Sequence, residues 1–341
     1  MPTIQDVAKK AGVSTGTVSN VLNGLPSVSR SNIEKVNRAI LELGYRRNDA
    51  ASQLRSNISN TIGLIIPDIT NPFYPEVMRG VDDAARKEGY NVFLCNKDRS
   101  VAAEDNAIEA MLRKNVDGII IFKPQANREK IKEIQNICAV VLIDANPALI
   151  NCDIVNVDDY EGMVRNVQTS IEGGHRRIAF VSGLDGTLSS KNRLKAFKDT
   201  ITRFNLPERE EYLADGNFTV ERGMEAFRFF ISLPEPPTVI LTSNDQMAKG
   251  AIIMASEMGV KIPDDISIIG YDDIYDAKWT QPSLTTNWHP KYELGASVAQ
   301  LLFKRIFQGR GRQNVEREVV TMSTVFRMRN SFSPLRGLSP L

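Results

Sequence analysis

The stretch TIQDVAKKAGVSTGTVSNVLNG, residues 3–24, contains two short helical patterns that meet at Gly12. Gly12 can adopt the left-handed backbone that ends a helix, and Ser14 is a good N-cap for the helix that follows. The apolar or small residues recur at the spacing of one helical face. They are Ile4, Val7, Ala8 and Ala11 in the first pattern and Val18, Val21 and Leu22 in the second. The stretch therefore predicts a helix, a tight turn and a second helix.

A third helical pattern follows, with Ser31 and Glu34 spaced as a capping box and Gly44 at its end. Its apolar face consists of Ile33, Val36, Ile40 and Leu43. Each helix is too short to be stable alone, so the three must bury their apolar faces against one another. We expect residues 1–46 to form an all-α helix-turn-helix head.

The N-terminal side of the second helix carries small polar residues. In a helix-turn-helix protein this helix lies in the DNA major groove, where such side chains reach base edges and phosphates. Asn20 can form two hydrogen bonds with adenine, and a threonine can contact thymine. The alternative is a three-helix bundle with an ordinary polar face. The candidate DNA-binding residues in this helix are Ser14, Thr15, Gly16, Thr17, Ser19 and Asn20.

Positive charge is concentrated at the N-terminus. Residues 1–58 contain eight Lys or Arg against four Asp or Glu, while the whole chain has a net charge of only +1. A basic head on a mildly acidic body is typical of a nucleic-acid-binding module joined to a domain with another task. A chance fluctuation of surface charge would look similar, so the charge supports the interpretation without deciding it.

Length and composition exclude several classes of protein. A chain of 341 residues with 42% hydrophobic residues can form two or three domains with separate cores. Neither a signal-peptide pattern nor an apolar segment of about 18 residues occurs, so we expect a cytoplasmic protein with no membrane partner. The three cysteines have no metal-ligand spacing, and we expect them to be reduced, with no disulfide, metal or cofactor.

The quoted stretch, together with VSRSNIEKVNRAILELGYRRN at residues 28–48, resembles the head of the LacI/GalR family of bacterial repressors. The resemblance rests on the motifs T-I-x-D-V-A, A-G-V-S, T-V-S, L-N, V-S and L-G-Y at fixed spacing. It implies that Thr15, Gly16 and Asn20 read bases. Gly16 stands where many members carry a larger residue, so it offers no side chain for readout there.

Residues 47–60 form a linker in which Ala50, Ala51 and Leu54 have helical spacing but little else to bury. Alone, such a segment should be frayed. The family resemblance implies a hinge helix that forms on DNA and inserts Leu54 as an apolar wedge into the minor groove. Arg47 stands where a proline is common, and Ser52 where a basic or amide residue is common. The alternative is that Leu54 packs against the body.

The body is predicted to be α/β, with parallel sheets and right-handed crossovers, because short apolar runs alternate with amphipathic helical segments. A second series of runs begins near Arg177, which favours two lobes over one large sheet. The predicted strands are 62–66, 91–94, 118–122, 140–143, 154–157, 178–181, 239–241 and 266–269.

The body also resembles the periplasmic-binding-protein-like (type I) effector domain of the same family, which implies that residues 61–330 bind an effector and dimerise. That fold implies a lobe 1 at about 61–158 and 289–319 and a lobe 2 at about 159–288 and 320–330. Residues 331–341 are rich in Pro and Ser and are predicted to be a flexible tail.

Ligands of such sheets bind beyond the carboxyl ends of the strands, here in the cleft between the lobes. Aromatic faces stack on sugars or purines, while carboxylates and amides bond hydroxyls. Lys123 ends a strand at a cleft position, which suggests an anionic effector held by Lys123 and Arg193, although a solvated lysine is equally plausible. Asn244 could instead be a helix cap, and Asp272 a loop residue. The effector-binding candidates, which the resemblance places in the cleft, are Phe73, Tyr74, Lys123, Asp144, Arg193, Phe218, Asn244 and Asp272.

No catalytic set is present in the sequence. The two histidines, His175 and His289, lie in no nucleophile context, and glycine-rich nucleotide-binding motifs are absent. Paired acids such as Asp158 and Asp159 are interpreted as surface or lobe-crossing residues. A sugar-modifying enzyme and a transporter's solute-binding protein are therefore disfavoured, the latter also by the head and by the missing export signal.

These features predict a DNA-binding transcription regulator, most simply a homodimeric repressor of a carbohydrate or sugar-acid operon. Two symmetry-related heads would bind a pseudo-palindromic operator in double-stranded DNA, and a sugar or sugar derivative in the cleft would switch the protein. A purine or another metabolite is the alternative effector. A phosphoprotein co-regulator follows from family analogy alone, and no residue pattern demands it.

Overall fold

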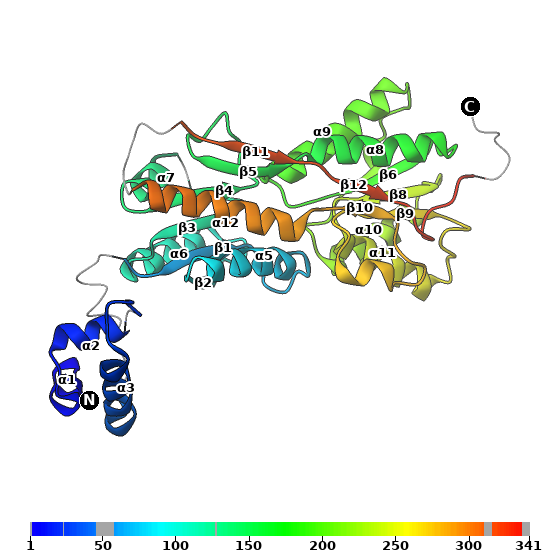
Figure 1. Cartoon of the computed structure of the whole chain (residues 1–341). Coiled ribbons are helices and arrows are strands. Elements are labelled where there is room, and N and C mark those ends of the chain that lie inside the picture. The colour runs from blue at the N-terminus through cyan, green and yellow to red at the C-terminus, as the bar shows by residue number, and fades with distance from the viewer. Residues whose placement is uncertain (1, 23, 46–57, 127, 310–315, 336–341) are drawn as a thin grey trace. The chain divides into compact units, whose positions relative to one another are not determined.

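The computed structural model describes residues 2–22, 24–45, 58–126, 128–309 and 316–335 (Figure 1). The chain divides into two compact units, residues 1–59 and 60–341. The first is a helical head and the second is α/β; we call the second unit the effector domain after the role predicted from the sequence. Leu54, the predicted minor-groove wedge, lies outside the described residues.

The head consists of α1 Ile4–Ala11, α2 Thr15–Leu22 and α3 Arg30–Leu43. Gly12 ends α1 and Gly44 ends α3, both in the left-handed conformation. The core is small and is centred on the fully buried Val7, Val18 and Val36. The predicted capping box of Ser31 and Glu34 is wrong, because α3 already begins at Arg30 and Ser29 accepts a hydrogen bond from the Asn32 amide.

Lobe 1 of the effector domain is a six-stranded parallel sheet in the order β11-β5-β4-β3-β1-β2. The strands are β1 Thr61–Ile66, β2 Asn91–Asn96, β3 Gly118–Phe122, β4 Ala139–Ile143, β5 Asp153–Val157 and β11 Val319–Met322. Alternate residues of β1 face opposite sides, so Ile62 and Leu64 pack in the core with α5 and α12 while Ile65 packs in the core with α6 and α7. These helices are α5 Phe73–Lys87, α6 Val101–Arg113, α7 Arg128–Gln135 and α12 Lys291–Gln308.

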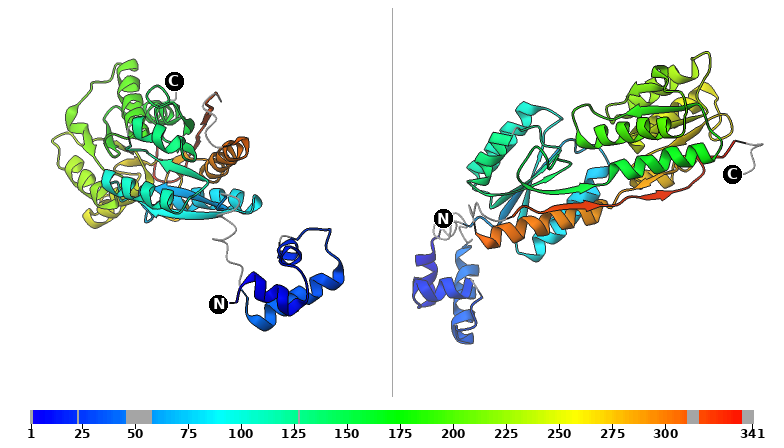
Figure 2. Two further views of the ribbon diagram at one scale, coloured as in Figure 1. Left: turned by 90° about the vertical axis from the view of Figure 1, so that its left-hand side faces the viewer. Right: turned by 90° about the horizontal axis from the view of Figure 1, so that it is seen from above.

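Lobe 2 contains a four-stranded parallel sheet in the order β7-β6-β8-β9 and an antiparallel pair, β10 with β12. The strands are β6 Ile178–Ser182, β7 Leu213–Asp215, β8 Val239–Thr242, β9 Ser267–Ile269, β10 Thr286–Trp288 and β12 Val325–Arg327. The helices are α8 Asp159–Glu172, α9 Leu188–Arg203, α10 Val220–Ile231 and α11 Asp245–Met258, with two short 3-10 turns, η1 Glu210–Tyr212 and η2 Tyr275–Lys278. The chain passes between the lobes after β5, after β10 and after β11 (Figures 1 and 2).

All eight predicted strand segments are strands, but β7, β10, β11 and β12 were not predicted. One lobe boundary is also wrong. Residues 320–322 were predicted in lobe 2, whereas β11 pairs with β5 in register from Val319 opposite Ile154 to Met322 opposite Val157. Lobe 1 therefore extends to Met322. The short runs at β11 and β12 look alike in the sequence, and only pairing with distant strands assigns each to its lobe.

The predicted flexible tail is also wrong for its first five residues. Ser331 accepts a hydrogen bond from the Ile268 amide at 2.7 Å and donates one to the Ile268 carbonyl at 2.6 Å. Phe332 is buried, and the Leu335 amide donates to the carbonyl of Gly173. The edge of β9 has main-chain groups that need partners, and this segment supplies them. Residues 336–341 lie outside the described part of the chain.

Glycine allows two helix pairs to pack closely. A Cβ on Gly295 of α12 would lie 2.0 Å from the carbonyl oxygen of Val77 in α5, and one on Gly80 would lie 2.1 Å from that of Tyr292. The pair of α10 and α11 repeats this arrangement at Gly223 and Gly250. Figures 1 and 2 show α5 and α12 side by side along lobe 1.

Gly295→Ala should therefore destabilise the effector domain. Because the added methyl group meets main-chain atoms that cannot rotate away, we expect a loss of about 1–3 kcal/mol in the free energy of unfolding. Gln300→Ala, on the exposed side of the same helix, is the matched control and should change it by less than about 0.5 kcal/mol. Urea unfolding monitored by circular dichroism would measure both, and equal midpoints would contradict the close approach.

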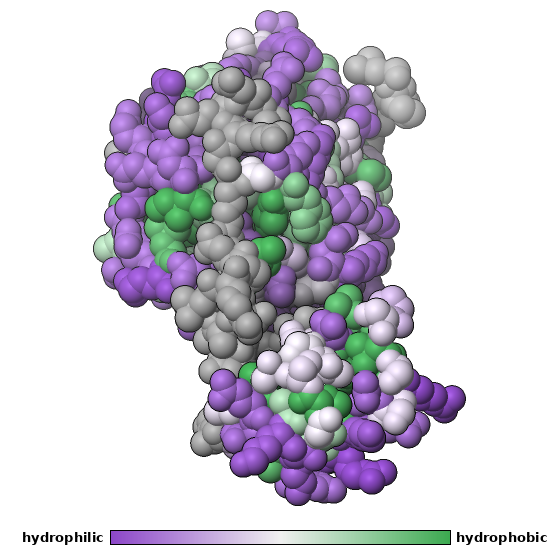
Figure 3. All heavy atoms as spheres, turned by 60° about the vertical axis from the view of Figure 1, so that its left-hand side comes forward, coloured by the Kyte–Doolittle hydropathy of each residue, from purple (hydrophilic) through white to green (hydrophobic). Residues whose placement is uncertain are grey.

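Among the described residues no helix is long and apolar enough to cross a membrane. On the face of the molecule drawn in Figure 3, hydrophilic residues cover most of the effector domain, and hydrophobic residues form small separate patches. The apolar residues of the strands are buried instead, in the cores on the two sides of each sheet.

Candidate functional site

The candidate DNA-binding surface is the N-terminal side of α2. Ser14, Thr15 and Gly16 are exposed, Thr17 and Asn20 are half-buried, and Val18 holds the helix to the core. Ser14 Oγ accepts a hydrogen bond from the Thr17 amide at 3.1 Å and lies 2.9 Å from Thr17 Oγ1. Ser14 thus caps the helix. Ser19, the remaining candidate, is also half-buried.

Gly16 has no packing reason to be a glycine. A Cβ at this position would have Ser14 Oγ as its nearest neighbour, at 3.7 Å, which is an ordinary contact. A Cβ would therefore be accommodated on the isolated head. Gly16 therefore leaves one position on the exposed surface of the helix without a side chain.

In the effector domain, the eight predicted effector residues all line one cavity. The cavity lies beyond the carboxyl ends of the strands of both sheets, where the sequence predicts the cleft. Sequence reasoning missed several further lining residues, among them Asp68, Asn71, Arg99, Asp159, Ser189 and His289. Each of them lies just after a strand or at the start of a helix. Many other polar residues of the chain do so as well, so this position alone does not identify a cavity residue.

One wall of the cavity is aromatic. Phe73 and Tyr74 begin α5, and their rings meet edge to face with centroids 5.3 Å apart. Phe122 at the end of β3 lies 5.3 Å from Tyr74, and His289 lies 5.1 Å from Phe73. Burial raises the pKa of Tyr74 well above its usual value, so its hydroxyl stays protonated. This wall can pack against the apolar face of a ring-shaped ligand.

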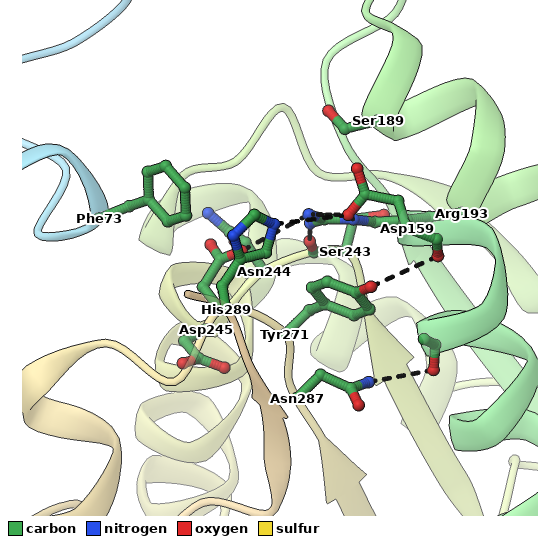
Figure 4. A network of polar contacts seen from close by, with 12 residues as sticks. Phe73, Asp159, Ser189, Arg193, Ser243, Asn244, Asp245, Tyr271, Asn287 and His289 are labelled. Carbon is green, nitrogen blue, oxygen red and sulfur yellow. Dashed lines mark hydrogen bonds and ion pairs between the residues drawn. The ribbon is translucent and has the colours of Figure 1, made fainter. Parts of the chain in front are cut away.

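Arg193 on α9 forms the centre of a buried ionic network (Figure 4). Its Nε and Nη2 donate to Oδ1 of Asp159 at 3.0 and 2.7 Å, and its Nη1 donates to the carbonyl of Ser243. Nη2 also lies 3.6 Å from Oδ1 of Asp272, and the guanidinium stacks 3.8 Å above the ring of Tyr271. The donors of Arg193 are therefore largely occupied by the protein itself.

Asp159 begins α8 directly after the first crossing between the lobes, in agreement with its interpretation as a lobe-crossing residue. Its neighbour Asp158 caps α8 through the Glu161 amide, but Asp159 is buried, only 5% exposed, beside Arg193. Burial alone would raise the pKa of Asp159, but the charge of Arg193 and the nearby His289 outweigh it, so the pKa lies well below its usual value. For Asp272 burial dominates over the attraction of Arg193, and its pKa is raised. Asp159 is thus the ionised partner of Arg193.

Lys123 and Asp144 form a second pair on the cavity wall, with Lys123 Nζ 3.5 Å from Asp144 Oδ2. The same ammonium lies 4.3 Å from the centre of the Phe218 ring. Asp144 also accepts hydrogen bonds from Ser189, at 2.8 Å from its amide and 2.7 Å from its hydroxyl. Burial lowers the pKa of Lys123, although Asp144 opposes this shift.

These pairings argue against the anionic effector suggested by the sequence. Lys123 and Arg193 each have a carboxylate partner, so neither offers an uncompensated positive charge. Counting all lining side chains gives three cations against four carboxylates: Arg99, Lys123 and Arg193, and Asp68, Asp144, Asp159 and Asp272. The cavity is suited to a neutral polar ligand.

Several lining residues have a left-handed backbone that is uncommon outside glycine. Lys123, Asp144, Phe218 and Asp272 have φ of 47°, 58°, 59° and 112°. Such residues cluster where the surrounding structure holds a functional geometry in place. Asn244 is different, because it caps α11 through the Met247 amide and also donates to the carbonyl of Phe218 at 3.4 Å. Its alternative interpretation as a helix cap is therefore confirmed, while its side chain still lines the cavity.

The fold and the cavity together define a helix-turn-helix head joined to a two-lobed ligand-binding domain. Residues 3–48 match the family described as "Bacterial regulatory proteins, lacI family", and residues 59–329 match "Periplasmic binding proteins and sugar binding domain of LacI family". The chain belongs to the LacI family and is a DNA-binding transcriptional repressor, not an enzyme.

Related proteins are similar along nearly the whole chain. Catabolite control protein A of Priestia megaterium is 36% identical over 331 residues, which cover 96% of this chain and 98% of the relative. The transcriptional repressor PurR of Pasteurella multocida is 33% identical over 97% of this chain and 98% of its own length. The structure of the lac repressor dimer bound to operator and the anti-inducer ONPF is 27% identical and aligns over 97% and 98% of the two chains, with a TM-score of 0.85.

Proposed function

We propose that the protein is a cytoplasmic, homodimeric repressor of a carbohydrate utilisation operon that binds a pseudo-palindromic operator and is switched by a sugar in the interlobe cavity. The observation that carries this proposal is the cavity itself. It combines an aromatic wall, Phe73 with Tyr74, with carboxylates already paired with cations, as at Asp144 and Lys123. Aromatic faces and paired polar groups are the chemistry that binds a neutral polyhydroxy ring.

One buried atom at the cavity supports a ligand rich in hydroxyl groups. Nδ1 of His289 is buried and has no hydrogen-bond partner among the described residues, and His289 lines the cavity. Buried polar atoms are normally hydrogen-bonded, so such an atom calls for an explanation. A ligand hydroxyl could donate to it or accept from it, depending on the ring tautomer.

A purine is the alternative effector, because it would stack on the same aromatic wall and because several relatives are repressors named PurR. Titration calorimetry of the full-length protein with neutral sugars, sugar phosphates and purine bases distinguishes the three classes. We expect heat of binding with a neutral sugar. If only a purine binds, the effector is a purine and the carbohydrate proposal is wrong. If only a sugar phosphate binds, the effector is anionic, as the sequence suggested.

A surface of lobe 2 supports the homodimer. Tyr275 and Trp279 on and next to η2 are 65% and 66% exposed, and Lys278 Nζ lies 4.8 and 5.1 Å from the centres of their rings. Ile253 on α11 is exposed as well, and Lys249 of that helix pairs with Asp276 of η2, so the two elements adjoin. Exposed aromatic residues beside apolar ones are typical of protein interfaces. We propose this lobe 2 surface, made of Ile253, Tyr275 and Trp279, as part of the dimer interface.

Selection of bound duplexes from a random library, at a stated near-physiological salt concentration, tests the DNA-binding part of the proposal. We expect enrichment of a pseudo-palindrome, because a two-fold dimer presents two identical heads. Enrichment of a single asymmetric half-site would contradict the proposal that the protein binds DNA as a homodimer. The minor-groove role proposed for Leu54 predicts in addition a deformable step at the centre of the site.

Asn20→Ala should weaken binding to the selected operator by roughly 5- to 150-fold, the range of about 1–3 kcal/mol for one lost bidentate base contact. Its effect on non-specific DNA should be small, since that binding depends on phosphate contacts. Asn37→Ala, the same substitution on the exposed face of α3, is the control. Equal losses on specific and non-specific DNA, measured by fluorescence anisotropy, would show that Asn20 does not read a base.

A further inference from the structure

The predicted linker joins the effector domain at Asn60, the residue directly before β1. Asn60 has a left-handed backbone with φ of 49°, so the chain changes direction at this residue. Its amide donates to Oδ2 of Asp117 at 2.9 Å, and its carbonyl accepts from the Asn91 amide at 2.9 Å. Both main-chain groups of the last linker residue are therefore bonded to other segments of lobe 1.

Asp117 holds the chain on both sides of this junction. It lies 57 residues further along the chain than Asn60, directly before β3, and is only 1% exposed. Besides accepting from the Asn60 amide, it donates its own amide to the carbonyl of Thr61 at 2.8 Å. A hydrogen bond to an ionised carboxylate is stronger than one between neutral groups. The side chain and the main chain of one residue thus bond to Asn60 and Thr61 together.

Asp117 is itself held in place by the turn that ends α6. Asn115 has a left-handed backbone with φ of 52°, and its amide donates to the Leu112 carbonyl at 2.9 Å. Val116 is buried in the core with α6 and α7, and its amide donates to the Met111 carbonyl at 3.3 Å. The carboxylate of Asp117 cannot follow a moving linker unless this turn is disturbed as well.

Strand pairing does not require the bond between Asn60 and Asp117. The ladders that β1 forms with β2 and β3 begin at Thr61 and Ile62, so Asn60 precedes both. Asn60 is also an exposed residue, and water can satisfy a main-chain amide at such a position. A buried carboxylate here therefore adds a restraint on the direction in which the chain enters β1.

We propose that Asp117 is a positioning residue for operator binding. By fixing Asn60, it sets the direction in which the linker leaves lobe 1, and thereby the range of half-site spacings that the two heads of a dimer can span. The inference rests on the proposed function in so far as it takes the protein to bind a pseudo-palindrome as a homodimer. A head on a loosely anchored linker is spread over more positions, so its effective concentration at the correct half-site falls.

Operators of altered spacing measure this role. One base pair added to or removed from the centre of the selected operator changes the separation of the half-sites by about 3.4 Å and their relative rotation by about 35°. Fluorescence anisotropy at one fixed salt concentration would compare the selected, longer and shorter duplexes on the full-length protein. We expect the wild type to bind both altered duplexes at least about tenfold more weakly than the selected one. Equal binding of all three would contradict a fixed linker direction.

Asp117→Ala removes the acceptor of the Asn60 amide and is the decisive variant. We expect it to bind the selected operator more weakly than the wild type does, and to bind the altered duplexes within about threefold of the selected one, because loosened linkers reach all three spacings. Binding to a duplex with a single half-site should stay at the wild-type value, since the head is unchanged. Asp105→Ala, which removes an exposed aspartate of α6, is the matched control and should behave as the wild type.

Two results with Asp117→Ala would overturn the inference. One is a folded variant that distinguishes the three spacings as sharply as the wild type. The other is an equal loss of binding to the single half-site, because the loss would then not depend on how the two heads are spaced. Asp117→Asn keeps the volume and one acceptor oxygen but removes the charge, so its discrimination should lie between those of the wild type and Asp117→Ala. Should Asp117→Ala unfold, shown by circular dichroism, Asp117→Asn replaces it, and wild-type discrimination there would contradict the role of Asp117.

Hydrogen exchange at the Asn60 amide tests the anchor without DNA. In the wild type we expect this amide to exchange at least about tenfold more slowly than an unprotected amide, because its acceptor is the buried Asp117. Exchange at the unprotected rate would overturn the inference whichever sequence the protein selects. Selection of a single asymmetric half-site would instead contradict the homodimer and leave the exchange measurement to decide on Asp117, so the two proposals can fail separately.

Discussion

Arg193→Met is expected to lower the free energy of unfolding of the effector domain by about 3–5 kcal/mol at pH 7. The variant has similar volume but leaves Asp159 and Asp272, which are 5% exposed each, without their shared cation. It also leaves the carbonyl of Ser243 without this donor. Chemical unfolding of the ligand-free protein measures the effect.

The dependence on pH identifies the cause of that loss. In the wild type the pKa of Asp159 is depressed, because Arg193 and His289 outweigh burial. Its ionised form therefore contributes stability above the ordinary pKa of an aspartate, and that contribution is lost only as the pH falls through the depressed value. Without Arg193, burial raises the pKa of Asp159, so ionisation destabilises the variant. The difference in the free energy of unfolding between the wild type and Arg193→Met should therefore become smaller as the pH falls from about 7 to about 4.

Arg222→Met is the matched control for this experiment, since Arg222 pairs with Glu225 on an exposed face of α10. Its loss should cost less than about 1 kcal/mol and show no such dependence on pH. If the loss in the free energy of unfolding of Arg193→Met does not depend on pH, then Arg193 stabilises the domain by packing against Tyr271 and not by compensating the charge of the carboxylates.

Trp279→Arg should lower the apparent affinity for the selected operator by at least about 100-fold. If the lobe 2 surface belongs to the dimer interface, a charged residue there separates the protomers, and one head must then bind alone. Two linked heads gain roughly 10²- to 10⁴-fold over one through effective concentration. Anisotropy titrations combined with sedimentation would relate affinity to the oligomeric state.

Phe204→Arg provides the comparison, because Phe204 is an exposed apolar residue of lobe 2, at the end of α9. It should change neither the oligomeric state nor the operator affinity. A Trp279→Arg protein that stays dimeric and binds operator normally would place the dimer interface elsewhere. A monomer with unchanged affinity would contradict the need for two heads.

The sequence was sufficient for features set by local spacing. Helices α1 and α2, the turn at Gly12 and the cap at Ser14 follow from a 3.6-residue period and from two residues with special backbone roles. The main strands of both sheets follow from short apolar runs separated by helices. The rule that ligands bind beyond the carboxyl ends of parallel strands, read together with the family resemblance, then selected eight residues that line one cavity.

Tertiary structure decided what those residues do to one another. Lys123 and Arg193 looked like free cations, yet their carboxylates come from Asp144, Asp159 and Asp272, each on a different strand end. Asp159 was interpreted as a surface or lobe-crossing acid, and only the fold shows that it is buried beside Arg193. The same holds for β11 and for Ser331, whose partners lie more than 60 residues away in the sequence. A periodic pattern records which face of an element is apolar, but ion pairs and strand edges are completed only when distant segments meet, so their partners are fixed by packing and not by spacing.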